Sequence, residues 1–316
     1  MEILKPPVKD ILEKKIRIYS ETIWKDKVED GLLKQWVENF TNSDPATQNQ
    51  ERLNAIYLLS KFLYYGNKET REMLKCIYRD KFQYNVIQQI RKDNGMTSDL
   101  SIIKPSFNDV LSKTRFLGVG NPSESGMHLL YYFRQENELT KDLFIHSHEI
   151  FKIDSSRSIS LADKSIKRYI FIDDFCGSGQ QAISYSQNIV DNIKSLDSST
   201  QVDYYPLFAT DEGILKVKKG TSFDNVDAVF TLDSSYKCFE INSRYFAEHK
   251  DEPLIDKMFA RSTCEKYGKK LFYHPLGYND CQLLLAFFHN TPDNTLPIFW
   301  SEKDSWRPFF KRYHKK

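Results

Sequence analysis

Residues 169–181 read YIFIDDFCGSGQQ, and this stretch decides the fold. An apolar run ends at Ile172 and is followed by Asp173 and Asp174, a loop of small residues and a helix-like segment. A short apolar run bounded by turn residues is typical of a buried strand. Strands that alternate with helical patterns over residues 114–232 predict a mostly parallel sheet. We therefore expect an α/β fold with residues 169–174 as a central strand.

The loop after the two aspartates is suited to binding an anion. Ligands of open α/β sheets lie beyond the carboxyl ends of the strands, and backbone N–H groups at a helix N-terminus attract phosphate. Carboxylates accept hydrogen bonds from hydroxyl groups, so Asp173 and Asp174 suit the diol of a sugar. Together they predict a sugar 5-phosphate site whose phosphate-binding residues are Gly177, Ser178, Gly179, Gln180 and Gln181.

The stretch resembles the signature of type I phosphoribosyltransferases: an apolar strand, two acids, a few variable residues and a Ser/Thr-Gly loop. The resemblance implies that Asp173 and Asp174 are the catalytic pair and face the ribose of phosphoribosyl pyrophosphate (PRPP). Mg²⁺ would be held through the ligand, with no direct protein metal site. Gln180 and Gln181 depart from the family pattern, which has a small residue and a threonine there. With this departure, phosphate binding is retained more easily than catalytic turnover.

Two upstream segments fit the same family. RFLGVGNPSESG (residues 115–126) has the place of its pyrophosphate loop, for which the resemblance implies Gly120, Asn121, Ser123, Ser125 and Gly126. Residues 152–167 are polar and basic and have the place of its flexible loop, implying roles for Arg157, Lys164 and Lys167.

Two other interpretations of the FCGSG loop remain open. The loop is similar to one of the S-adenosylmethionine-dependent DNA methyltransferases, but Asp174 replaces their proline. The only Pro-Pro pair, Pro6-Pro7, is followed by valine and cannot serve as their amine-binding motif. A purely structural strand end is the second alternative.

Apolar residues at helical spacing predict an all-helical N-terminal domain over residues 1–95. The phosphoribosyltransferase-like α/β domain is then expected over residues 100–316. Its C-terminal stretch, residues 275–308, can form a hood over the sugar site that supplies Tyr278, Asn279 and Asn294; an edge hairpin that completes the core is the alternative. A tail such as NTPDNTLPIFW and the helical extension resemble the degenerate phosphoribosyltransferase domains of bacterial conflict systems, including retron-associated antiphage effectors.

Composition sets the remaining expectations. Lys and Arg number 45 against 43 Asp and Glu, a balance that does not predict nucleic-acid binding over the whole surface. The five cysteines form no CxxC pair, and no signal-peptide core or membrane-length apolar run occurs, so a cytoplasmic protein without a membrane partner is expected. The expected ligand is PRPP or a nucleotide; the resemblance leaves room for a reverse transcriptase or nucleic-acid partner and for a homo-oligomer. A phosphoribosyltransferase-like enzyme is favoured narrowly over a non-catalytic ribose-phosphate sensor.

Overall fold

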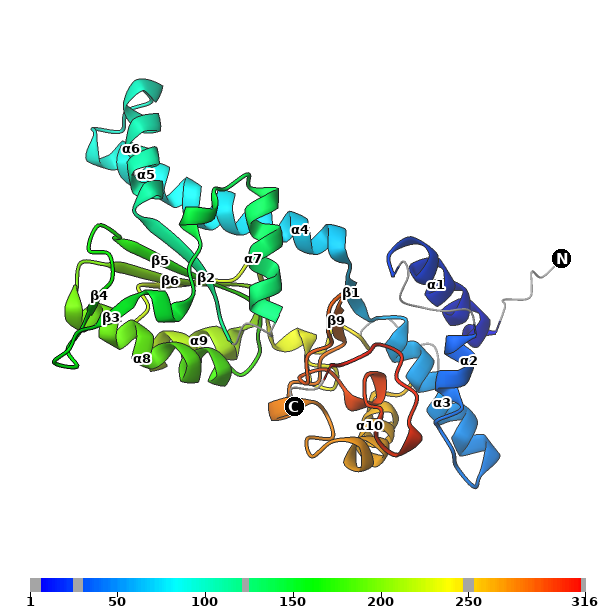
Figure 1. Cartoon of the computed structure of the whole chain (residues 1–316). Helices are drawn as coiled ribbons and strands as arrows, with labels where there is room; N and C mark the ends of the chain where they lie inside the picture. Colours follow the sequence, from blue (N-terminus) through cyan, green and yellow to red (C-terminus); the bar gives the residue numbers. More distant parts are fainter. Residues whose placement is uncertain (1–6, 25–30, 121–124, 247–252, 314–316) are drawn as a thin grey trace. The chain divides into compact units, whose positions relative to one another are not determined.

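The computed structural model of the chain describes residues 7–24, 31–120, 125–246 and 253–313 (Figure 1). The chain forms two compact units. Met1–Lys68 and Asp233–Lys316 together make one, which we call the terminal unit, and Glu69–Leu232 make the other, the sheet unit. This division differs from the predicted domains 1–95 and 100–316.

The sheet unit is an α/β structure. Its helices are α4 (Asn67–Cys76, which starts at the boundary), α5 (Tyr84–Asp93), α6 (Leu100–Ser112), α7 (Ser125–Glu136), α8 (Gln180–Leu196) and α9 (Asp211–Gly220), with a π-helical turn at Ile77–Gln83. Its strands are β2 (Thr114–Gly118), β3 (Phe151–Ile153), β4 (Ile159–Leu161), β5 (Arg168–Cys176), β6 (Gln201–Thr210), β7 (Asn225–Val226) and β8 (Phe230–Leu232).

The main sheet has five strands, all parallel, in the order β2-β5-β6-β7 with β8 also paired to β6. The predicted central strand is confirmed, because β5 lies between β2 and β6. Ile172 pairs with Gly118 of β2 on one side and with Tyr205 of β6 on the other. The predicted mostly parallel α/β sheet is therefore present.

Both faces of this sheet are covered by helices. On one face, Phe116 of β2 packs against Phe133 of α7 and Phe82 of the π-helical turn. On the other, Phe171 of β5 belongs to a core with Val190 of α8 and other residues of α8 and α9. Figure 1 shows α8 and α9 together on one side of the sheet. A strand buried on both faces explains why the sequence of β5 is apolar without alternation.

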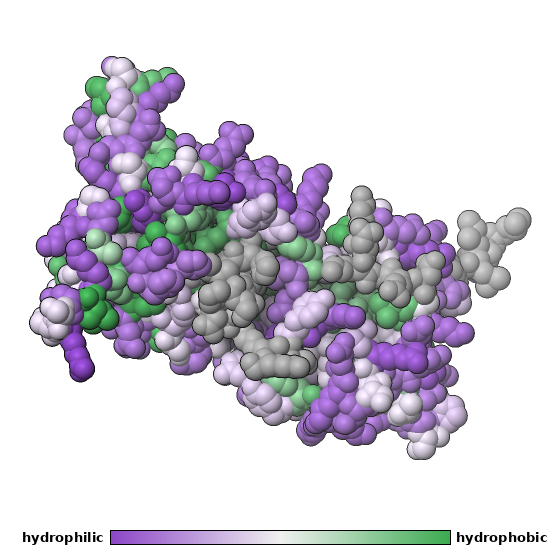
Figure 2. Space-filling model, viewed as in Figure 1, coloured by the Kyte–Doolittle hydropathy of each residue, from purple (hydrophilic) through white to green (hydrophobic). Residues whose placement is uncertain are grey.

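Residues 152–167 are more ordered than the predicted mobile loop, because β3 and β4 pair there as an antiparallel hairpin. The apolar segment VDAVFTL (residues 226–232) does not form one strand but is split between β7 and β8. At the far end of this unit, Met96, Leu100 and Ile102 are exposed around the α5–α6 connection, where Figure 2 shows apolar atoms among mostly hydrophilic ones.

The terminal unit combines α1 (Val8–Thr22), α2 (Leu32–Val37), α3 (Pro45–Leu59), β1 (Leu63–Tyr65), α10 (Lys257–Leu271) and β9 (Leu285–Phe287). Helices α1, α2 and α3 form part of the predicted helical N-terminal region. This region also contains β1, which pairs in parallel with β9 from the C-terminal part. Side chains also connect the N-terminal and C-terminal parts of this unit. The Trp36 indole N–H donates to the carbonyl of Ile298 at 2.9 Å.

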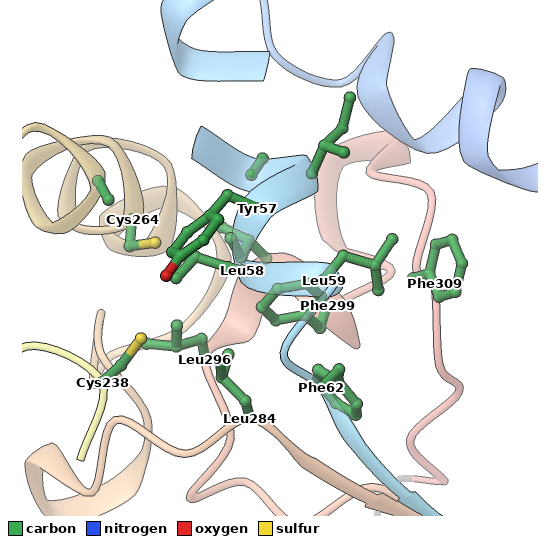
Figure 3. Packing of buried hydrophobic residues seen from close by; sticks show 14 of the residues in the cluster. Tyr57, Leu58, Leu59, Phe62, Cys238, Cys264, Leu284, Leu296, Phe299 and Phe309 are labelled. Atoms are coloured by element: carbon green, nitrogen blue, oxygen red, sulfur yellow. The ribbon is translucent and has the colours of Figure 1, made fainter. Parts of the chain in front are cut away.

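A cluster of buried side chains holds this unit together. Figure 3 shows Leu58, Leu59 and Phe62 from the α3–β1 segment packed among Leu296 and Phe299 from the C-terminal segment. This packing explains why the C-terminal residues group with the N-terminal helices rather than with the parallel sheet. None of the described helices combines the length and apolarity that crossing a bilayer requires.

Candidate functional site

The candidate site forms where β5 ends and α8 begins. Three residues, Gly177–Gly179, connect them, and Gly179 caps the helix in the left-handed conformation with φ of 75°. No side chain caps this end of α8, although the N–H of Gln180 lies 3.4 Å from the Ser178 hydroxyl. The first-turn N–H groups of a helix have no carbonyl partners within the helix. This end of α8 can therefore donate several hydrogen bonds to an anion.

The loop is locked in place by the start of α9. The Thr210 hydroxyl donates to the carbonyl of Gly177 at 2.6 Å and accepts from the N–H of Gly213 at 2.9 Å. A Cβ atom at Gly213 would lie 2.3 Å from the Gly177 carbonyl oxygen, and one at Gly179 would lie 2.9 Å from the Gly213 carbonyl oxygen. Glycine is therefore required where the loop and α9 touch, and the loop backbone is preorganised.

Asp173 does not face an open cleft, although the family resemblance implies that both acids face the ribose. Its side chain is 6% exposed, and it accepts hydrogen bonds from the Tyr204 hydroxyl at 2.8 Å and from the N–H of Asp174 at 2.9 Å. Burial, and next the negative charge of Asp174, raise the pKa of Asp173 well above its usual range. The Asp173 side chain is therefore buried against Tyr204 of β6.

A thiol completes this buried group. Cys176 is 3% exposed, and burial followed by the charge of Asp173 raises its pKa to about 12. Burial and the charge of Asp173 also raise the pKa of Tyr204 well above its usual range. A neutral, buried thiol of this kind is not a nucleophile.

Asp174 is the acid that reaches the surface. It is half-buried, as is Ser178, whereas Gln180 and Gln181 are exposed at the start of α8. The structure therefore brings together one accessible carboxylate and a set of helix N-terminal donors a few residues apart. Such a pair can bind hydroxyl groups and a phosphate of the same small molecule.

The predicted pyrophosphate loop starts at the same edge of the sheet. The N–H of Val119 donates to the carbonyl of Ile172, so Gly120, with φ of 100°, follows the strand next to the acid pair. Asn121 and Ser123 lie outside the described residues. Ser125 and Gly126 begin α7, and only their backbone is described.

The basic residues assigned to a flexible loop are not gathered at the site. Arg157, with φ of 63°, occupies the turn of the β3–β4 hairpin, and Lys164 is exposed in a later turn. Lys167 bonds through its backbone to Lys113 and Gln201, at the amino end of the sheet. The nine residues of β5 separate it from the loop by about 30 Å. The structure therefore does not place Lys167 at the loop, and its ammonium pairs with Asp197 at 2.9 Å.

The three hood residues belong to the terminal unit, where two of them meet. The Asn294 amide donates to the carbonyl of Tyr278 at 3.3 Å, and Asn294 is 5% exposed. Asn279 is exposed and adopts φ of 55°. Asn294 therefore fixes the backbone of this segment, while Tyr278 and Asn279 are accessible.

The donor set was tested for a directly bound metal. Within the described ranges, no group of three or more His, Cys, Asp or Glu side chains could hold a metal ion. Asp173 is buried, so Asp174 is the more accessible carboxylate of the pair. One accessible carboxylate would leave most of the coordination of a Mg²⁺ ion to ligand oxygens.

Tyr204 and Thr210 are the positioning residues that sequence reasoning missed. Thr210 is recognisable in retrospect, because Thr-Asp-Glu-Gly followed by an apolar run is a helix start whose threonine caps the N-terminus. Tyr204 carries no such signal, since its hydroxyl meets Asp173 only through the pairing of β5 with β6.

One family model matches most of the chain. The model of the PRTase-CE family matches residues 33–312. Among solved structures, Helicobacter pylori xanthine-guanine-hypoxanthine phosphoribosyltransferase is 9% identical over 52% of this chain and 85% of its own, with a TM-score of 0.27. Orotate phosphoribosyltransferase from Aeropyrum pernix is 12% identical over 41% and 73%, with a TM-score of 0.24. At these scores the structural likeness carries no information on the site. No curated protein matches the chain.

Proposed function

The chain belongs to the phosphoribosyltransferase-like PRTase-CE family, and from this premise we propose that it binds PRPP or a nucleotide 5′-phosphate at the Gly177–Gln181 loop. The observation that carries the proposal is the glycine-locked loop between the central parallel strand β5 and the N-terminus of α8. A preformed ring of backbone donors at this position of an open α/β sheet favours a phosphate group.

Each residue then has a distinct role. The N–H groups at the start of α8 and the Ser178 hydroxyl bind the 5-phosphate, and the amides of Gln180 and Gln181 can add donors. Asp174 accepts hydrogen bonds from the ribose hydroxyls. Asp173 is a positioning residue, because it accepts from the N–H of Asp174 and so fixes the backbone that presents its carboxylate. A Mg²⁺ ion carried by the ligand would offset the charge of the pyrophosphate, beside the Asp174 carboxylate.

Two versions of this function differ in whether turnover follows binding. In the enzyme, the Asp174 carboxylate stabilises the cationic ribose ring that develops as pyrophosphate leaves. The burial of Asp173 supports the alternative of a non-catalytic sensor, since Asp174 is then the more accessible of the two carboxylates for the ring. We keep the sensor as the second candidate on this observation.

The biological setting that we propose is a bacterial antiphage system of the retron-like kind, in the cytoplasm, with the chain as effector or accessory. Its support is the likeness of the tail and of the helical extension to conflict-system domains. A reverse transcriptase with its nucleic acid is the partner expected in such a system, and a homo-oligomer is compatible with it. A neighbouring reverse-transcriptase gene, and phage protection lost on Asp174→Asn, are the expected observations.

One titration tests the proposal at the molecular level. PRPP and adenosine 5′-monophosphate (AMP) are titrated into the full chain with Mg²⁺, beside the Asp174→Asn variant. We expect both ligands to bind and the variant to bind PRPP about tenfold more weakly, as for loss of one charged hydrogen bond. Release of pyrophosphate from labelled PRPP identifies the enzyme, and binding without release identifies the sensor. No binding of either ligand to folded protein contradicts the proposal.

A further inference from the structure

We propose that the terminal unit contains a second binding site, which takes the base of a nucleotide. The site is a pocket of about 400 Å³, within the range of small-molecule sites. The residues that line it include Tyr64, Phe287, His289, Asn290, Lys311 and Tyr313. All of them belong to the terminal unit, so the inference goes beyond the phosphate site of the sheet unit.

Aromatic rings form the inner wall of this pocket. Phe287 is 4% exposed, and the His289 ring stacks on it at 5.6 Å with an interplanar angle of 6°. The Tyr64 ring stacks on Phe310 at 5.4 Å and 16°. Phe309, which also lines the pocket, is part of the buried cluster shown in Figure 3. Flat rings held by a packed core favour a planar ligand, because a base stacks on aromatic faces.

Hydrogen bonds hold the two segments of the pocket together before any ligand binds. The Asn290 side-chain oxygen accepts from the backbone N–H groups of Thr291 and Tyr313, each at 3.0 Å. The Thr291 hydroxyl donates to the carbonyl of Lys311 at 2.9 Å. Residues 287–291 and 308–313 therefore form one preorganised wall, and a ligand loses little free energy in ordering them.

The polar groups of the pocket select an anionic ligand with hydrogen-bonding edges. Among the residues that the structure describes, the Lys311 ammonium makes no ion pair and the Asn290 amide nitrogen makes no hydrogen bond. Tyr313 is 64% exposed and offers a ring at the mouth. An ammonium beside aromatic rings and a side-chain amide matches a phosphate beside a base. A phosphate beside a base occurs both in a free nucleotide and in the terminal nucleotide of a single-stranded nucleic acid.

The test separates this pocket from the phosphate loop by blocking the loop. Ser178→Asp places a negative charge among the loop donors, so the remaining nucleotide binding reports the pocket. In this background, AMP and a short oligoadenylate are titrated by calorimetry against Tyr313→Ala and Lys311→Gln. Tyr313→Phe keeps the ring, and Lys303→Gln removes another exposed lysine of the same unit that does not line the pocket. All four changes lie at exposed positions, so folding is preserved.

We expect AMP or oligoadenylate to bind in the Ser178→Asp background, and Tyr313→Ala and Lys311→Gln each to weaken it about fivefold or more. Tyr313→Phe and Lys303→Gln should leave the affinity unchanged, and ribose 5-phosphate, which lacks a base, should not bind. Tighter binding of oligoadenylate identifies a strand end as the source, and equal binding a free nucleotide. No binding of either probe, or binding that both test variants leave unchanged, overturns the proposal. Ribose 5-phosphate binding by the unaltered chain tests the loop separately.

Discussion

The phosphate loop of the sheet unit and the aromatic pocket of the terminal unit are built in opposite ways. The loop is a continuous stretch of backbone whose shape depends on close contact between Gly177, Gly179 and Gly213. The pocket is assembled from side chains that lie far apart in the sequence, from Tyr64 to Tyr313. A site built from backbone tolerates few substitutions at its glycines. A site built from side chains can lose one lining side chain while the protein keeps its fold. Substitutions at Gly213, Tyr204 and Asp173 test the rigidity of the loop and of the buried groups next to it.

The largest effect is expected from Gly213→Ala. The added Cβ would lie 2.3 Å from the Gly177 carbonyl oxygen and 2.7 Å from that of Cys176, so backbone must move. We expect a loss of about 3 kcal/mol in the free energy of unfolding and loss of phosphate binding, measured by denaturant unfolding and calorimetry. Gly220→Ala is the control in the same helix, because its Cβ would meet only the flexible Ile183 side chain at 3.1 Å. Equal effects of the two changes would refute the locked loop.

A smaller loss is expected from Tyr204→Phe. The change removes the hydroxyl that donates to Asp173 at 2.8 Å and leaves a buried carboxyl group without that partner. We expect the free energy of unfolding to fall by about 2 kcal/mol at neutral pH. Tyr185→Phe is the matched control, because its hydroxyl meets the neutral Ser147 hydroxyl at a part-buried position, and it should cost only about 0.5 kcal/mol. A Tyr204→Phe protein as stable as the control would show that the buried bond is unimportant.

Asp173→Asn should change the pH dependence of stability. Because the folded-state pKa of Asp173 is raised above its unfolded value, the stability that it contributes is fully present below the unfolded pKa and is lost as pH rises through the folded pKa. Asparagine resembles the neutral acid and does not titrate. The stability of the variant relative to the unaltered chain should therefore rise as pH increases from the unfolded pKa of an aspartate through the folded pKa of Asp173.

Thermal unfolding measured from acidic to neutral pH gives this difference. Asp197→Asn provides a contrast, because hydrogen bonds from Ser199, and next the bond from Lys167, lower the pKa of Asp197. The contribution of Asp197 is present above its unfolded pKa and is lost as pH falls, so its sign is opposite. A constant difference between Asp173→Asn and the unaltered chain would mean that Asp173 is charged at no cost in the folded protein.

The smallest effect is expected from Lys167→Gln. Its side chain is 51% exposed, and its ammonium pairs with Asp197 at the amino end of the sheet. The change should cost about 0.5 kcal/mol or less in stability and leave PRPP binding unchanged in calorimetry. Weakened PRPP binding would instead restore Lys167 to the site and contradict the placement of this end of the sheet.

The sequence was informative where a feature is local. The apolar run of β5, its two acids and the small-residue loop are contiguous, so the central strand and the start of α8 could be predicted. The side-chain direction of Asp173 could not, because it depends on Tyr204 in the neighbouring strand. Nor could the division into units be predicted, because β1 pairs with β9 more than two hundred residues later, as Leu63 with Leu285. The pocket has the same origin in long-range pairing.

The central claim is that the Gly177–Gln181 loop binds the phosphate of a ribose 5-phosphate ligand, and one calorimetric comparison tests it most directly. Ribose 5-phosphate and PRPP are titrated into the unaltered chain, Ser178→Ala and Ser178→Asp. The account predicts binding to the unaltered chain, binding weakened about five- to tenfold in Ser178→Ala through loss of one donor, and no measurable binding in Ser178→Asp, whose carboxylate repels the phosphate. Equal affinity of all three proteins, or no binding by the folded unaltered chain, would contradict it.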